Sequence, residues 1–534
     1  MGTTSYEYDT NRRIEAINYD YSLSGLTNVQ RVEYTYNEDS SIDTVTWKDD
    51  VNTVATWAYT YDQAGRIASV TSFGETTTYT YDGQNKILTQ TNDNGTSTEY
   101  TYNDDRGWRT NITQDNGGTP FAEYDLTYDA GSNTVGNLTR VDESGGDYVV
   151  YAYNDLHRLT SETRTGIGSF ANTFVYDLAG NLTTLNSSSF ATYDSANKIA
   201  SIPSGSISND ADGNITAVTG AGLSATSLSW DSRSKLVSQT NSSVTIDYGY
   251  DNKGRRIWSQ VGANPKTYFI YSADKLVGEI SGSPQFPTAA YTWGADGLIS
   301  ERLIQGGDSY WYHFGPQGET RQLTDNLGAT VNSYAYDAYG KTLSSSGSVP
   351  NSYKYGGKYG YYTDGSAGMM LAGARWYSSL LKRWISRDPI KYEGGFNLYE
   401  YVNGNPMRYV DPSGNGPEEA LSALSDFWRY YREVKNRNGT DKYYHCKSHC
   451  SAVKRGAWGN VTSLAVGVVK EAIDTVKNPL MYGMSLQQSF EDCDKDTLAN
   501  VIGRVLASRL PGVSCESICD PLWPNGMDRK FQKG

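Results

Sequence analysis

Cysteine is absent from the first 445 of the 534 residues of this chain. All five cysteines lie in the last 90 residues: Cys446, Cys450, Cys493, Cys515 and Cys519. Disulfides and cysteine-bound metals are therefore excluded from most of the molecule. The contrast predicts a long cysteine-free scaffold followed by a short tail under different chemical constraints.

Long apolar runs and an excess of basic residues are also lacking. Mean hydropathy is −0.59, so we expect no transmembrane helix. The formal charge of −14 disfavours a nucleic-acid partner for the scaffold, because phosphate binding needs basic patches. The N-terminus lacks the pattern of a signal peptide. Either export uses another route, or the chain is the C-terminal part of a longer polypeptide; the uncapped first repeat favours the second.

Tyrosine is abundant, with 44 residues, and it recurs in a Tyr-x-Tyr-Asp-x-x-Gly-Arg-Ile unit. Aromatic and β-branched residues between turn formers favour strands and hairpins. Clear copies of the unit begin at Tyr6, Tyr59, Tyr79, Tyr176 and Tyr250, and weaker copies surround Tyr36, Tyr102, Tyr128, Tyr153 and Tyr193. Each copy predicts a strand, a turn and a second strand.

The copy at residues 59–67 shows why the unit has this composition. Tyr59 and Tyr61 are two residues apart and so share one face of a strand. Asp62 can accept a hydrogen bond from the backbone two residues on, and Gly65 supplies a positive φ. Since one hairpin cannot bury its apolar face, neighbouring copies must stack into a long sheet.

The repeats, over roughly residues 1–414, resemble the YD repeats of the Rhs family of polymorphic bacterial toxins. The same repeats occur in the C component of insecticidal toxin complexes and in teneurins. The resemblance implies a mainly β protein whose strands spiral into a hollow β-shell. From the repeats alone, a plain adhesive β-solenoid with nothing inside is the alternative.

Residues 271–415 resemble the Rhs repeat-associated core domain. The matching motifs are residues 312–321, 334–340, 373–377, 383–390, 397–406 and 411–415. The resemblance implies that this segment closes one end of the shell and cleaves the chain just past its second Asp-Pro-x-Gly motif.

The carried-over cleavage candidates are Asp388 and Asp411, with Arg387 positioning a carboxylate or polarising the carbonyl. The expected scissile bond is Asn415–Gly416. Two adjacent carboxylates cannot both ionise, so one keeps a proton. One then activates water while the other donates to the leaving amide, in a single-turnover aspartyl-type reaction without a cofactor.

Two departures from the family pattern bear on this expectation. The family usually has Gly where this chain has Lys391, and Leu where it has Asn415. The Asn415–Gly416 pair could instead react by asparagine cyclisation. Asp388 and Asp411 could also be ordinary turn residues before prolines.

Residues 416–534 change to helical spacing, with apolar positions repeating in 418–436, 460–477 and 496–510. We expect a small bundle of about four helices. Asp441-Lys442-Tyr443-Tyr444-His445, Lys454-Arg455-Gly456 and residues 496–500 resemble serum amyloid A. That resemblance implies an amphipathic bundle that touches lipid or other apolar partners, and no enzyme.

The tail cysteines form two pairs, Cys446 with Cys450 and Cys515 with Cys519, each spaced i, i+4 on one helical face. Two disulfides between such helices would staple a small domain and leave Cys493 free or paired elsewhere. The alternatives are reduced core thiols and a metal site of His445, Cys446, His449 and Cys450.

The sequence thus predicts a β-repeat shell (1–270), a core domain (271–415) and a helical cargo domain (416–534). The expected function is that of a secreted or cell-surface effector that presents and releases its C-terminal toxin or cargo. Expected partners are a target cell or its membrane, an immunity protein and a secretion-system component, and the chain is expected to be a monomer. The alternative is a non-toxic adhesion protein whose tail is a structural cap.

Overall fold

The computed structural model describes residues 3–103, 106–129, 136–203, 205–220, 223–241, 244–364, 369–393 and 395–419. The chain divides into two compact units, Met1–Pro417 and Glu418–Gly534. All but the first two residues of the second unit lie outside the described residues, as do the predicted tail helices, all five cysteines, His445 and His449.

The first unit begins with a 17-stranded antiparallel sheet in which each strand pairs with its neighbours in the sequence. Its strands are β1 (Thr3–Tyr8), β2 (Ile14–Asp20), β3 (Gln30–Tyr36), β4 (Ile42–Asp49), β5 (Asn52–Tyr61), β6 (Ile67–Ser72), β7 (Glu75–Tyr81), β8 (Ile87–Thr91), β9 (Thr96–Tyr102), β10 (Arg109–Asn116), β11 (Thr119–Tyr128), β12 (Leu138–Glu143), β13 (Tyr148–Tyr153), β14 (Leu159–Thr165), β15 (Phe170–Tyr176), β16 (Leu182–Leu185) and β17 (Ser188–Ser189).

A second sheet has 14 strands in the same sequential order. They are β20 (Ser206–Asn209), β21 (Ile215–Gly220), β22 (Leu223–Trp230), β23 (Leu236–Asn241), β24 (Val244–Tyr250), β25 (Arg256–Val261), β26 (Thr267–Ser272), β27 (Lys275–Ser281), β28 (Phe286–Gly294), β29 (Gly297–Leu303), β30 (Asp308–Phe314), β31 (Thr320–Thr324), β32 (Thr330–Tyr336) and β33 (Thr342–Ser346).

Short elements complete the described chain. They are β18 (Thr192–Tyr193), β19 (Ile199–Ser201), β34 (Tyr362–Asp364), β35 (Met369–Ala372), β36 (Arg375–Ser378), β37 (Arg383–Trp384), β38 (Tyr409–Val410), β39 (Glu418–Glu419) and the 3-10 turns η1 (Ser22–Ser24), η2 (Gly357–Tyr359), η4 (Lys391–Glu393) and η5 (Val402–Gly404). None of the helical segments among the described residues is long and apolar enough to cross a membrane.

The turn chemistry predicted for the repeat unit is confirmed. Asp62 Oδ1 accepts hydrogen bonds from the amides of Ala64 and Arg66, at 2.9 and 3.0 Å. Gly65 has a φ of +74°, which a residue with a side chain rarely adopts. The turn therefore joins β5 to β6 in the way that the sequence indicated.

A contact between successive repeats was not predicted from the sequence. The second tyrosine of a unit donates its hydroxyl hydrogen to the carbonyl of the residue that opens the strand after the preceding turn. Nine such bonds span 2.6–2.8 Å: Tyr36 to Ile14, Tyr61 to Ile42, Tyr81 to Ile67, Tyr102 to Ile87, Tyr153 to Leu138, Tyr176 to Leu159, Tyr193 to Leu182, Tyr250 to Leu236 and Tyr271 to Arg256. Each bond ties one hairpin to the next.

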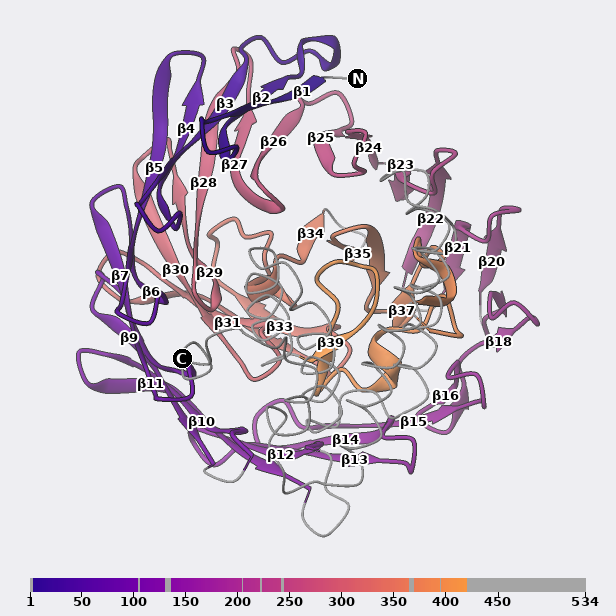
Figure 1. The fold of residues 1–534 in the computed structure, drawn as a ribbon. Coiled ribbons are helices and arrows are strands. Elements are labelled where there is room, and N and C mark those ends of the chain that lie inside the picture. Colours follow the sequence, from indigo (N-terminus) through magenta and orange to yellow (C-terminus); the bar gives the residue numbers. More distant parts are fainter. Residues whose placement is uncertain are drawn as a thin grey trace, which may run out of the picture. The chain divides into compact units, whose positions relative to one another are not determined.

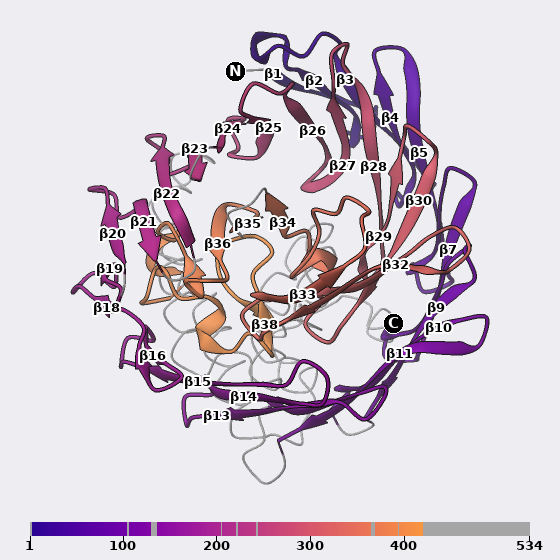
Figure 2. The same ribbon diagram turned by 180° about the vertical axis from the view of Figure 1, so that it is seen from behind.

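The two large sheets pack face to face near the N-terminus. Strands β2–β5 contribute Trp47 and Trp57 to a core that also contains β26–β29. Trp57 Nε1 donates to Thr292 Oγ1 at 3.2 Å, and Tyr19 donates its hydroxyl to the Tyr271 carbonyl. Figures 1 and 2 show the two layers side by side.

Residues 353–364, 369–393 and 395–410 lie on the concave side of the curved wall formed by β9–β16 (Figures 1 and 2). Their aromatic side chains, including Tyr361, Tyr377, Trp384 and Tyr401, share a core with Ile112, Leu159 and other residues of that wall. The prediction of a mainly β fold is confirmed. Within the described part of the chain both large sheets remain open, because each has two end strands that pair on one side only.

Candidate self-cleavage site

The two predicted aspartates meet at one arginine. Nη2 of Arg375 lies 2.9 Å from Oδ2 of Asp388 and 2.9 Å from Oδ2 of Asp411. All three residues are buried, with an exposed fraction of 5% or less. Because a buried carboxylate needs a partner, the arginine makes this pairing of two acidic groups tolerable.

Two tight turns bring these groups together. Arg375 opens β36 directly after the turn from β35, and Asp411 follows β38. The amide of Ala374 donates to the carbonyl of Ser413 at 2.8 Å. A Cβ at Gly373 would lie 2.2 Å from that carbonyl oxygen, so only glycine allows this close approach of the turns.

Asp411 binds the backbone that follows it. Its Oδ1 accepts from the amide of Asn415 and its Oδ2 from the amide of Gly416, both at 3.1 Å. Ser413 Oγ also donates to Oδ1, at 3.2 Å. The nitrogen of the expected scissile bond is therefore in hydrogen-bond contact with one of the two predicted carboxylates.

Backbone hydrogen bonds within the core domain fix the position of Asp388. Its Oδ1 accepts from the amide of Ile390 at 2.9 Å, and its own amide donates to the Leu398 carbonyl at 3.0 Å. The same carbonyl accepts from Nη1 of Arg375 at 3.3 Å. One backbone oxygen thus orients both the aspartate and the arginine.

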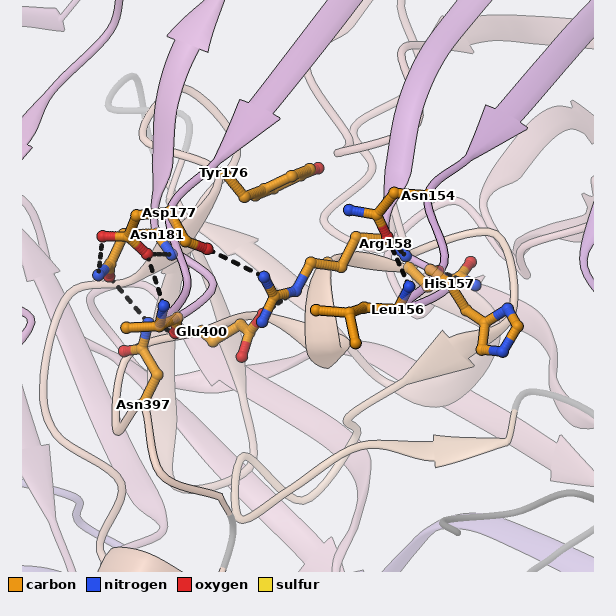
Figure 3. A network of polar contacts seen from close by, with 12 residues as sticks. Asn154, Leu156, His157, Arg158, Tyr176, Asp177, Asn181, Asn397 and Glu400 are labelled. Atoms are coloured by element: carbon orange, nitrogen blue, oxygen red, sulfur yellow. Dashed lines mark hydrogen bonds and ion pairs between the residues drawn. The ribbon is translucent and has the colours of Figure 1, made fainter.

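The repeat turns anchor this segment (Figure 3). The Asn397 side chain donates to the Ala179 carbonyl at 3.0 Å and to Asn181 Oδ1 at 2.8 Å. Arg158, in the preceding repeat turn, donates to the Asp177 carbonyl and pairs with Glu400 at 3.6 Å. Residues 397–400 are therefore positioned by two successive turns of the wall.

Burial sets the electrostatics of the site. It raises the pKa of Asp388 to about 6 against the opposing effect of Arg375, and it also raises the pKa of Asp411. Burial lowers the pKa of Arg375, which the two carboxylates oppose. Asp388 is the more open of the two acids, with 5% exposure against 1% for Asp411. Both carboxyl groups therefore bind a proton more readily than an exposed aspartate does, and Arg375 limits this effect.

The side chain of Arg387 contacts a tyrosine rather than the two aspartates. Its Nε donates to the hydroxyl of Tyr399 at 3.2 Å, and that hydroxyl donates to the Gly213 carbonyl. Arg375 occupies the place that the sequence analysis gave to Arg387. Arg375 belongs to the matched motif at residues 373–377, but nothing in its spacing from Asp388 and Asp411 indicated an ion pair.

Tyr361 is a further residue of the site that the sequence analysis missed. Its hydroxyl accepts from the amide of Asp411 at 2.7 Å and from the hydroxyl of Tyr401 at 3.1 Å. The contact fixes the backbone at Asp411. Among the described residues, no group of three or more His, Cys, Asp or Glu side chains could hold a metal ion.

Comparison with known protein families places the two parts of the chain separately. The family model described as teneurin YD-shell matches residues 1–170 and 122–407, and the model described as serum amyloid A protein matches residues 415–517. The gap between the two matches, residues 408–414, comes just before the expected scissile bond.

Relatives of both kinds are found. The tRNA3(Ser)-specific nuclease WapA of Bacillus spizizenii is 29% identical over 404 residues, which is 67% of this chain but 16% of that protein. Serum amyloid A-3 protein of Bos taurus is 35% identical over 89 residues, which is 16% of this chain and 68% of that protein. This chain thus spans about a sixth of the length of the nuclease relative.

Solved structures share the fold. The Photorhabdus luminescens Tc holotoxin pore superposes with a TM-score of 0.64 at 17% identity, over 79% of this chain and 24% of that chain. With the matches above, the chain belongs to the teneurin YD-shell family, and its C-terminal region belongs to the serum amyloid A family.

Proposed function

We propose that this chain is the shell and release segment of a secreted or cell-surface effector of the Rhs type. The β-shell encloses or presents the serum amyloid A-like domain, and aspartyl-type self-cleavage at Asn415–Gly416 releases it. The contact between Asp411 Oδ2 and the Gly416 amide nitrogen, at 3.1 Å, carries the proposal. The nuclease and holotoxin relatives support membership in a family of toxins.

The different positions of the two aspartates assign them different roles in the cleavage. Asp411 touches the leaving nitrogen, so it acts as the general acid that protonates Gly416 N when the bond breaks. Asp388 is the more open carboxylate and acts as the base that takes a proton from the attacking water. Arg375 joins both Oδ2 atoms and stabilises the negative charge as it moves between them.

The cleavage test uses the purified full chain on a denaturing gel, with mass spectrometry of the products. Asp388→Asn should abolish hydrolytic release of the fragment that begins at Gly416, and Asp411→Asn should abolish its release altogether. Asp325→Asn is the control, because the Asp325 carboxylate also accepts from turn amides, those of Leu327 and Ala329, at a turn outside the site. An unchanged fragment in both site variants would contradict the assignment.

The tail would act on a target cell or its membrane, with an immunity protein and a secretion-system component as further partners. The match to serum amyloid A favours an amphipathic, non-enzymatic domain that binds apolar surfaces. Disulfides among Cys446, Cys450, Cys515 and Cys519 would hold the released domain together in an oxidising place. Mass spectrometry of the released fragment without reductant measures this pairing.

The alternative function is that of a non-toxic adhesion protein whose tail is a structural cap. Expression of residues 416–534 alone, in the cytoplasm and in the periplasm, separates the two. Growth arrest in either compartment supports the effector, and harmless expression in both supports the cap.

A further inference from the structure

Asn415 carries a second nucleophile beside the expected scissile bond. Its main-chain amide is fixed by Asp411 Oδ1 and by Ser413 Oγ, at 3.1 and 3.2 Å. Among the described residues, its side-chain amide makes no hydrogen bond, and the residue is half-buried. The backbone is therefore held in place while the side chain is left to turn toward its own carbonyl carbon.

We propose that the Asn415–Gly416 bond also breaks without water, by attack of the Asn415 side-chain nitrogen on its own main-chain carbonyl carbon. The route depends on the proposed function for the position of the cut and for Asp411 as proton donor. It differs in the nucleophile, and it leaves the shell with a cyclic imide at its C-terminus.

The atoms balance as follows. The Nδ2 lone pair forms a bond to the Asn415 carbonyl carbon and closes a five-membered ring. The bond from that carbon to Gly416 N breaks, and its electron pair stays on the nitrogen, which takes a proton from Asp411 Oδ2 at 3.1 Å. Nδ2 gives up one proton to solvent, and Asp411 later regains one, so no water is consumed and no oxidant is needed.

The same contact disfavours the competing reaction of Asn-Gly pairs, deamidation. Deamidation requires Gly416 N to lose its proton and attack the Asn415 side chain. In this site that proton is donated to a carboxylate, which stabilises the N–H group rather than its deprotonated form. The carboxyl group that accepts this bond can, once protonated, donate to the nitrogen that must leave, so the contact favours cleavage of the chain over deamidation.

The proposal is tested by letting the unaltered full chain cleave in heavy-oxygen water and measuring the masses of the products. Hydrolysis puts one heavy oxygen into the new carboxylate of the shell fragment. Cyclisation gives a shell fragment lighter by one water and without heavy oxygen at early times. We expect this lighter species. Complete heavy-oxygen incorporation from the first time point would overturn the cyclisation route and leave the proposed function standing.

Two variants separate the routes. Asn415→Leu removes the side-chain nucleophile, so the lighter species should be lost. Asp388→Asn removes the base for water, so the heavy-oxygen species should be lost while the lighter one persists. Cyclisation is wrong if Asp388→Asn abolishes every product but Asn415→Leu does not. The aspartyl route is wrong if Asn415→Leu abolishes every product, Asp388→Asn does not, and no product contains heavy oxygen. A wild-type chain that stays intact overturns both.

Discussion

One guanidinium nitrogen of Arg375 lies 2.9 Å from Oδ2 of Asp411, and the two residues are 36 positions apart in the sequence. Both side chains are almost fully buried. The pair links the turn after β35 to the turn after β38, and Asp388 joins it through the same nitrogen. The arrangement gives the site a fixed cation where the sequence alone indicated only two acids.

Replacing Arg375 should impair release and change its pH dependence. In Arg375→Gln the cation that opposes burial is lost, so the pKa of Asp388 should rise above about 6 and the release rate should fall by about tenfold or more. The rate of fragment formation across pH measures both effects.

Arg387→Gln is the control, because Arg387 contacts Tyr399 rather than the aspartates. A rate in Arg375→Gln that equals the rate in Arg387→Gln at every pH would contradict the role of Arg375.

Acidification should slow the water-dependent release. Asp388 must be ionised to take a proton from water, and burial raises its pKa to about 6. The rate should therefore rise with pH through about 6, and the raised pKa of Asp411 widens the pH range in which that acid stays protonated. A time course of release between acid and mildly basic pH tests this profile. A rate that stays constant through pH 6 would exclude Asp388 as the base.

The hydrogen bonds of Asn397 to the repeat turn should contribute both to the free energy of unfolding and to the rate of fragment release. Asn397→Ala removes the bonds to Ala179 and Asn181, and leaves the Asn181 acceptor without that donor. We expect a loss of about 1–2 kcal/mol in the free energy of unfolding and slower fragment formation. Asn11→Ala, in an exposed turn, is the control. Unchanged release in Asn397→Ala would show that the segment is held without this bond.

The tyrosine hydrogen bond between successive repeats should contribute measurably to the free energy of unfolding. Tyr81→Phe deletes the hydroxyl that donates to the Ile67 carbonyl at 2.6 Å, and it should lower the free energy of unfolding by about 1 kcal/mol. Tyr8→Phe serves as comparison, because Tyr8 is 58% exposed. Denaturant unfolding of the two variants measures the difference, and equal midpoints would mean that water replaces the bond at no cost.

Much of the wall could be predicted from local chemistry. The spacing of Asp62 and Gly65 defines a turn within one unit, and turns of this kind depend on residues close in the sequence. The inter-repeat bond of Tyr81 could not be predicted in the same way. Its acceptor is a backbone carbonyl 14 residues away, and any residue type offers a carbonyl there.

The family resemblance identified Asp388 and Asp411 as candidate site residues in two separate motifs. Only the tertiary structure shows that both contact the same arginine. Arg375 and Arg387 both stand in matched motifs, and the sequence gives no physical reason to choose between them. The choice depends on two turns packed against each other at Gly373 and Ser413.

The sequence by itself determined the repeat unit, its strands and turns, and the change of character near residue 416. These are local properties, because periodicity and turn chemistry act over a few residues. The tertiary structure decided which arginine joins the aspartates, and that Asp411 contacts the Gly416 nitrogen. Such contacts depend on burial and close approach between distant segments, which the order of residues does not specify.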